Sequence, residues 1–135
     1  MMLALDTNTI SYYFRGDDVV RARLHALAPS DVAVPAVVVY ELKFGLFRLP
    51  PQAREPRLQA LAQFLAPLTL LPFDALGADH AARLRAALES LGTPIGPHDT
   101  SIAATALAHG ATLVTRNVSE FSRVPGLLLE NWHPS

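Results

Sequence analysis

The sequence predicts an α/β protein built on a mostly parallel β-sheet, and three features of the chain support this. Short apolar runs without helical period alternate with longer segments in which apolar residues recur at helical spacing. The short runs are almost entirely apolar, which is typical of strands buried on both faces. Proline and glycine separate the segments. We therefore expect a sheet covered by helices on both faces.

Five apolar runs are the expected strands. They lie at residues 2–5, 32–34, 68–71, 112–114 and 127–129. Each is bounded by a polar residue, a proline or a glycine, and none is long enough for a buried helix. The first run stops abruptly at Asp6, and the fourth is followed by Thr115, Arg116 and Asn117.

Helices are expected between these strands. They lie at residues 9–14, 17–28, 37–49, 52–65, 75–91 and 99–109, with a helical turn at 118–121. Thr9 is the expected N-cap of the first helix. Asp17 and Asp18 begin the second, where acidic side chains favour the helix dipole. Gly110 ends the helix before the fourth strand.

Composition limits the classes of protein that the chain can represent. Its 135 residues fit a single domain, residues 1–135. Half of the residues are hydrophobic, which indicates either a second buried surface, such as a subunit interface, or a core rich in alanine and leucine. The formal net charge is −1, so a nucleic-acid partner would need a local basic patch.

The lack of cysteine and the lengths of the apolar runs indicate where in the cell the protein is expected. The sequence has no cysteine, which excludes disulfides and thiolate metal sites and suits a reducing cytoplasm. The apolar run at the start of the sequence is too short to be the apolar part of a secretory signal. Pro35, Glu41, Pro67 and Pro72 interrupt every candidate membrane span. We expect a soluble cytoplasmic protein with no membrane partner.

Four polar residues from separate segments are expected to meet at one edge of the sheet. Ligands of open parallel sheets bind outside the carboxyl ends of the strands. Asp6 and Asn117 follow strands directly, Glu41 lies in the helix after the second strand, and Asp99 begins the helix that leads to the fourth. Carboxylates that converge repel one another unless a cation or a proton is present. Oxygen donors favour Mg²⁺ or Mn²⁺.

Each of these acids also has a structural interpretation. Asp6 could form a turn. Asp99 could be the N-cap residue of its helix or an acidic residue in the first helical turn. Glu41 lies among valines and is therefore expected to be buried, where it could pair with Lys43 or with an arginine. Lys43 does not share its helix face, however. His98, next to Asp99, is expected at the surface.

Three stretches of the sequence resemble the PIN-domain family, and more narrowly the VapC-type toxins of bacterial toxin–antitoxin pairs. They are LALDTNTIS at the start, VPAVVVYELKFGL around residue 41, and LGTPIGPHDTSIAATALAHGATLVTRNVSEFSRVPGLLLENW. The third stretch is long and specific, whereas residues 50–90 match mainly by helical pattern. The resemblance implies a three-layer α/β/α sandwich with a mostly parallel sheet of about five strands.

The resemblance also implies a Mg²⁺-dependent endoribonuclease whose acidic residues are those already named. Asp6, Glu41 and Asp99 match the metal-binding acids of the family, with Asp6 and Asp99 as the metal ligands. Asn117 matches a fourth catalytic position that is often aspartate. An asparagine brings less negative charge, which leaves open whether one or two ions are held. Thr115 matches a small hydroxyl residue near the site.

Further residues are expected to support the pocket or to contact RNA. Thr7 and Asn8 belong to the opening motif, where their side chains are expected to fix the turn that carries Asp6. Arg15 and Arg116 are the candidates for phosphate contacts, with Arg48 a weaker one. Water activated by Mg²⁺, or by Mn²⁺, would attack phosphorus and leave 5′-phosphate and 3′-hydroxyl ends.

The resemblance implies protein partners as well. They are a small cognate antitoxin of the VapB type, a second copy of the chain in a homodimer, and toxin–antitoxin hetero-oligomers. The expected walls of the antitoxin groove, which could equally be core, are Val19, Val20, Leu24, Leu42, Phe44 and Phe47.

Two other functions remain open from the sequence. A phospho-receiver module also places acids after parallel strands, but it needs a lysine after a later strand, and the one lysine, Lys43, lies in an expected helix. A PIN-like module with a decayed nuclease site, acting through a partner or DNA, is kept open by Asn117. The intact acids at positions 6, 41 and 99 disfavour it.

Overall fold

The computed structural model describes residues 1–133 and contains a five-stranded sheet in which every pair of neighbouring strands is parallel. The strand order is β3-β2-β1-β4-β5. The strands are β1 (Leu3–Leu5), β2 (Val32–Pro35), β3 (Thr69–Leu71), β4 (Thr112–Val114) and β5 (Leu129–Glu130). Each expected apolar run thus contributes a strand, and the predicted α/β class is confirmed.

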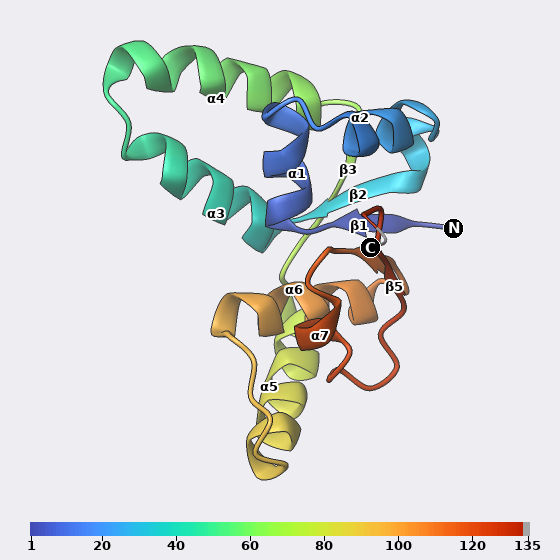
Figure 1. Ribbon diagram of the computed structural model, residues 1–135. Coiled ribbons are helices and arrows are strands. Elements are labelled where there is room, and N and C mark those ends of the chain that lie inside the picture. Colours follow the sequence, from blue (N-terminus) through green and yellow to red (C-terminus); the bar gives the residue numbers. More distant parts are fainter. Residues whose placement is uncertain (134–135) are drawn as a thin grey trace.

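Helices lie on both sides of this sheet, so the expected three-layer arrangement is confirmed. In Figure 1, α1, α2 and α4 lie on one side of the sheet and α5, α6 and α7 on the other, while α3 and α4 project beyond it as an arm. The helices are α1 (Thr7–Phe14), α2 (Asp18–His25), α3 (Ala36–Phe47), α4 (Pro51–Leu65), α5 (Ala75–Ser90), α6 (Pro97–Ala108) and α7 (Val118–Phe121), with a 3₁₀ turn at Pro29–Asp31.

The central strand β1 explains why the sheet needs this cover. Leu3, Ala4 and Leu5 are at most 3% exposed, because helices pack on both of its faces and β2 and β4 pair with its edges. In the β1–β4 register, Leu5 lies opposite Val114. The residues that follow, Asp6 and Thr115, therefore emerge side by side at the carboxyl edge of the sheet.

The structure differs from the sequence-based expectation at several element ends, of which the second helix and the last strand are examples. The second helix ends at His25 instead of continuing to residue 28, because the chain turns at Ala26 and Leu27 before the 3₁₀ turn. The last strand covers Leu129–Glu130 instead of residues 127–129. Only residues in register with Leu113 and Val114 can join the ladder, and register is a tertiary property.

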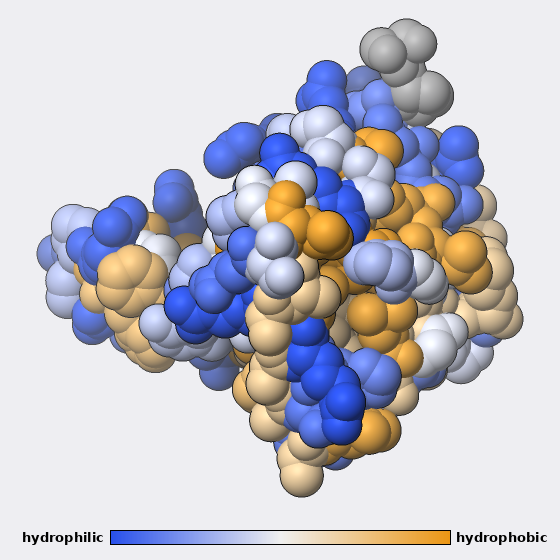
Figure 2. All heavy atoms as spheres, turned by 90° about the horizontal axis from the view of Figure 1, so that it is seen from below, coloured by the Kyte–Doolittle hydropathy of each residue, from blue (hydrophilic) through white to orange (hydrophobic). Residues whose placement is uncertain are grey.

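The hydrophobic excess is divided between the core and the surface. On α6, small residues such as Ala103, Ala104 and Ala106 are fully buried, which lets this helix lie closely between the sheet and α5. Several large apolar side chains nevertheless remain exposed, among them Leu91 and Leu128. Figure 2 shows hydrophobic patches between hydrophilic residues on the face seen from below. Among the described helices, none has the length and apolarity needed to cross a membrane.

We expect the change Leu88→Ala to lower the free energy of unfolding by about 2–4 kcal/mol, because it leaves a cavity in a close-packed core. Leu88 lies on α5 and is 1% exposed. Leu91→Ala is the matched control, since Leu91 is 71% exposed and should change stability by less than about 1 kcal/mol. Urea denaturation measures both. Equal effects of the two variants would contradict the described packing of α5.

Candidate active site

Asp6 lies at the junction of β1 and α1, where it is both buried and fixed. It is 3% exposed and is the N-cap residue of α1. Its Oδ1 accepts hydrogen bonds from the backbone N–H of Thr9 (2.9 Å) and from the Thr9 hydroxyl (2.6 Å). The prediction that Thr9 caps this helix was therefore wrong. Thr9 is instead the donor, because an N-cap carboxylate accepts from the N–H three residues later.

The surroundings of Asp6 disfavour its charged form. Burial raises the pKa of Asp6, hydrogen bonds from Thr115 and Thr9 oppose this rise, and the charge of Glu41 adds to it. Together these effects raise the pKa of Asp6. A cation beside Asp6 would reverse this effect, since it would stabilise the carboxylate.

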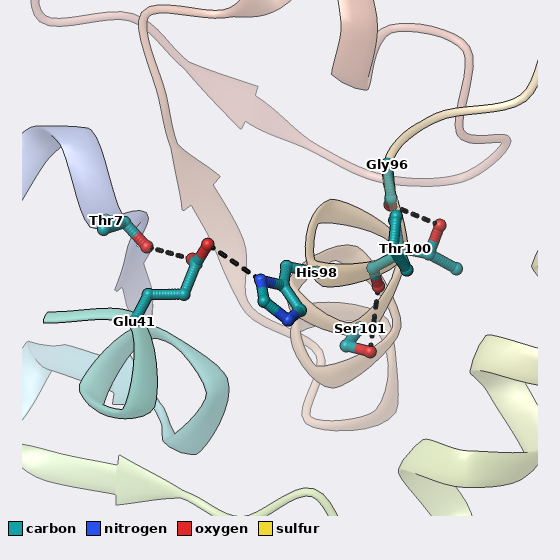
Figure 3. Close-up of polar contacts among 7 residues, drawn as sticks. Thr7, Glu41, Gly96, His98, Thr100 and Ser101 are labelled. Carbon is teal, nitrogen blue, oxygen red and sulfur yellow. Dashed lines mark hydrogen bonds and ion pairs between the residues drawn. The ribbon is translucent and has the colours of Figure 1, made fainter. Parts of the chain in front are cut away.

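Glu41 is held in place from two sides, by α1 and by α6. The Thr7 hydroxyl donates to Glu41 Oε1, and His98 Nδ1 lies 3.1 Å from Glu41 Oε2 (Figure 3). Neither Lys43 nor an arginine lies within salt-bridge distance of Glu41 in the described part of the chain. The ion-pair interpretation is thus not supported. His98 is half exposed, as expected, but it contacts the site.

Asp99 lies in the first turn of α6 without capping it, since Gly96 occupies the N-cap position. The pKa of Asp99 is raised to about 7. Burial is the largest cause, followed by the hydrogen bond and the charge of Glu120 and then by the charges of Glu41 and Asp6. These carboxylates are therefore close enough to repel one another, and we call Asp6, Glu41, Asp99 and Glu120 the acid centre.

Glu120, on α7, is a member of the acid centre that sequence reasoning missed. Its carboxylate accepts from Asn117 Nδ2 (2.7 Å) and from the backbone N–H of Gly96 (3.3 Å). Partial burial by itself would raise the pKa of Glu120, but these bonds and one from Asp99 outweigh it, and the pKa is lowered. The sequence feature that could have revealed Glu120 is its position in the helical turn after β4, three residues beyond Asn117.

The other predicted site residues differ in their placement. Asn117, expected as the fourth catalytic residue, donates to Glu120, so its amide positions a further carboxylate at this edge of the sheet. Thr115 accepts from the backbone N–H of Asn117 (3.0 Å) and bonds to Asp6. Asn8 is exposed, and within residues 1–133 its side chain has no hydrogen bond. The expectation that Asn8 fixes the turn of Asp6 is therefore wrong, and Thr9 has that role.

A groove of about 480 Å³ extends from the acid centre between α1, α3 and α4. Glu41 and Thr7 lie at its acidic end, and Phe14, Leu42 and Leu61 supply apolar lining. The remaining lining residues are Ser11, Arg15, Gly45, Leu46, Arg57 and Ala60.

The residues expected to form groove walls are distributed differently from the prediction. Leu42 does line the groove. Val20 is completely buried in the core, and Leu24 packs against it. Phe44 and Phe47 are 56% and 57% exposed and lie outside the groove lining. The rest of the lining comes from α3 and from α1 and α4, and sequence reasoning had not considered the last two helices.

The chemistry of the acid centre suits a hard divalent cation. Its donors are carboxylate oxygens, and burial together with the neighbouring negative charges raises the pKa of Asp99 to about 7. Among residues 1–133, no three acidic or histidine side chains are already arranged closely enough to hold an ion. Ion binding would therefore require side-chain adjustments within the acid centre.

Comparison with protein families agrees with this fold and site. The model of the PIN domain matches residues 3–127, which include the whole acid centre. The chain therefore belongs to the PIN-domain family.

Individual relatives narrow the similarity to the VapC group. Ribonuclease VapC2 of Rickettsia felis is 37% identical over 134 residues, which are 98% of each chain. The tRNA(fMet)-specific endonuclease VapC of Salmonella typhimurium is 34% identical over 95% of this chain and 96% of its own length. The crystal structure of R. felis VapBC2 bound to a promoter DNA fragment superposes with a TM-score of 0.89 at 35% identity, covering 98% of this chain and 100% of that one. The predicted VapC-type resemblance is thus confirmed.

We expect Asp99→Asn to change the pH dependence of stability in metal-free protein. Between the ordinary aspartate pKa of 3.8 and about 7, the folded state binds more protons at Asp99 than the unfolded chain does. The contribution of Asp99 to stability therefore falls as pH rises through this window, and the variant should lack that fall. Above the window it should be more stable than the parent by roughly 1–2 kcal/mol, since solvent screens part of the repulsion.

Urea denaturation in EDTA at several pH values measures this difference. Asp79→Asn on the exposed face of α5 is the control, because Asp79 is 57% exposed and pairs with Arg83. The same pH profile for the parent and for Asp99→Asn would contradict the described repulsion.

Proposed function

We propose that this chain is a Mg²⁺-dependent endoribonuclease and the toxin of a type II toxin–antitoxin pair. The observation that carries the proposal is the convergence of Asp6, Glu41, Asp99 and Glu120 at the carboxyl edge of the sheet, with the pKa of Asp99 raised to about 7. Membership of the PIN-domain family and similarity to VapC ribonucleases support the same conclusion. The reaction would be hydrolysis of an RNA phosphodiester bond.

Asp6 and Asp99 are the residues that would hold Mg²⁺, or Mn²⁺ in its place. When bound, the ion would polarise a phosphoryl oxygen and lower the pKa of a water molecule. Asp6 is suited to this task because the Thr9 hydrogen bonds fix its side chain at the end of β1. Asp99 carries a raised pKa without an ion, so a bound cation would stabilise its carboxylate and relieve the repulsion from its neighbours.

Glu41 and Glu120 would complete the negative charge of the site. Both oxygens of Glu41 have partners, Thr7 and His98, so this carboxylate is oriented before any substrate arrives. Glu120 is oriented by Asn117 and Gly96. Hydrolysis would leave 5′-phosphate and 3′-hydroxyl ends, with the attacking water giving up one proton and the departing 3′ oxygen taking up one from solvent.

The proposal includes the expected partners and context. A cognate antitoxin of the VapB type would occupy the groove between α1, α3 and α4, whose lining is mainly apolar. The exposed Tyr40, Phe44 and Phe47 on α3 are available for a homodimer or a hetero-oligomer. Residues 1–135 would act as one PIN domain in the cytoplasm.

The two alternative functions receive less support. A phospho-receiver needs a lysine beyond a strand, whereas Lys43 lies within α3 and is exposed. A binding module with a decayed site would have no reason to keep four carboxylates together against their repulsion. Asn117, which kept that alternative open, positions Glu120 here.

The central test is a ribonuclease assay on purified, antitoxin-free protein. We expect cleavage of RNA in Mg²⁺ and its loss in EDTA, and we expect Asp6→Asn and Asp99→Asn each to lower the rate by at least about 100-fold, because each removes charge from the ion site. Asp79→Asn should leave the rate unchanged. Cleavage that survives both chelation and these substitutions would rule out the metal-dependent mechanism.

Calorimetric titration with Mn²⁺ tests the ion site without activity. The parent protein should bind Mn²⁺, Asp99→Asn should abolish measurable binding, and Glu120→Gln should weaken it by about tenfold because one nearby negative charge is lost. Glu89→Gln, at an exposed position of α5, is the matched control. If the parent shows no specific uptake, the site is a decayed one and the binding-module alternative replaces the nuclease.

A further inference from the structure

Tyr12 has two arginine side chains on its ring, which no other aromatic residue in the described chain has. The guanidinium carbon of Arg15 lies 5.9 Å from the ring centroid and that of Arg116 lies 5.6 Å from it. Arg15 is the C-cap residue of α1, whereas Arg116 lies in the turn after β4. The ring therefore brings together two cations from separate segments, and we call Arg15 and Arg116 the arginine pair.

The arginine pair is not neutralised within the described chain. No carboxylate of residues 1–133 lies within salt-bridge distance of either guanidinium group, and both side chains are exposed. Asp17, at the start of α2, contacts His133 Nε2 instead (2.9 Å). The His133 ring packs edge-on against Tyr12 at 5.2 Å, which helps to fix the tyrosine ring.

The arginine pair borders the acid centre. Arg116 directly follows Thr115, which bonds to Asp6. Arg15 lines the same groove as Glu41 and Thr7. A polyanion that reaches the acid centre must approach a group of carboxylates, so a neighbouring pair of free cations would offset the repulsion and locate the polyanion.

We propose that Tyr12 and the arginine pair form a binding site for a backbone phosphate of the RNA substrate, next to the bond that is cut. Guanidinium groups bind phosphate oxygens through paired N–H donors. Tyr12 is a positioning residue in this site, because both guanidinium groups lie over its ring before RNA binds, which lowers the entropic cost of binding. The inference rests on the proposed ribonuclease function and adds to it the residues that locate the substrate.

Four variants separate the role of the ring from that of the charges. Arg116→Ala and Arg15→Ala each remove a cation and should weaken RNA binding by about fivefold to tenfold and reduce its salt dependence. Tyr12→Leu removes no charge but should weaken binding by about threefold to fivefold, because the arginines lose their support. Tyr12→Phe keeps the ring and should bind as the parent does, since the hydroxyl has no hydrogen bond within residues 1–133.

The measurements are the Kd for a fluorescent single-stranded RNA in EDTA at low salt, and KM and kcat for its cleavage in Mg²⁺. We expect weaker binding to appear as a higher KM with kcat little changed. In the Arg15→Ala/Arg116→Ala background, Tyr12→Leu should have no further effect, because the ring acts only through the two arginines. Arg85→Ala, which removes one exposed charge from α5, should change neither Kd nor KM.

The outcomes distinguish this inference from the proposed function. Normal cleavage in Mg²⁺ with an unchanged KM for Arg15→Ala, Arg116→Ala and Tyr12→Leu would overturn the phosphate site and leave the nuclease intact. RNA binding that depends on the arginine pair, without cleavage under any condition, would support the site and contradict the nuclease. If the variants bind RNA normally but lose binding to the antitoxin, the arginine pair belongs to the protein interface, and the inference is wrong.

Discussion

Electrostatic repulsion between carboxylates at one edge of the sheet is the constraint to which the rest of the site responds. The parallel register of β1 and β4 brings Asp6 to the edge shared with Thr115, and α6 and α7 bring Asp99 and Glu120 to the same region. Folding therefore concentrates negative charge where burial already disfavours it. The raised pKa of Asp99 is the measure of this conflict, and a proton or a divalent cation relieves it.

Hydrogen-bond donors from several segments hold the carboxylates against this repulsion. Thr9 and Thr115 serve Asp6, Thr7 and His98 serve Glu41, and Asn117 serves Glu120. Such contacts favour the charged forms and fix the side chains before a ligand binds, so they oppose part of the cost of burial. Stability and function make different demands here, since the arrangement that suits a cation is unfavourable without one.

Positive charge is distributed to complement this site even though the formal net charge of the chain is only −1. Arg15 and Arg116 lie together on Tyr12, beside the acid centre, while other arginines such as Arg83 and Arg85 form exposed pairs within α5. The same molecule can thus repel a polyanion at one point and attract it at the next. The apolar groove and the projecting arm of α3 and α4 offer a separate surface for protein partners (Figure 1).

Local sequence pattern is sufficient to locate the strands, the order of the helices and the segments that carry Asp6, Glu41 and Asp99, because hydrophobic periodicity and strand ends can be recognised along the chain. The three-dimensional structure was needed to find that Thr9 fixes Asp6, that His98 contacts Glu41, and that Asn117 positions Glu120. It also decided where β5 begins and which ring the two arginines share. These features depend on register and side-chain direction between segments far apart in the chain, and no local pattern encodes such distances.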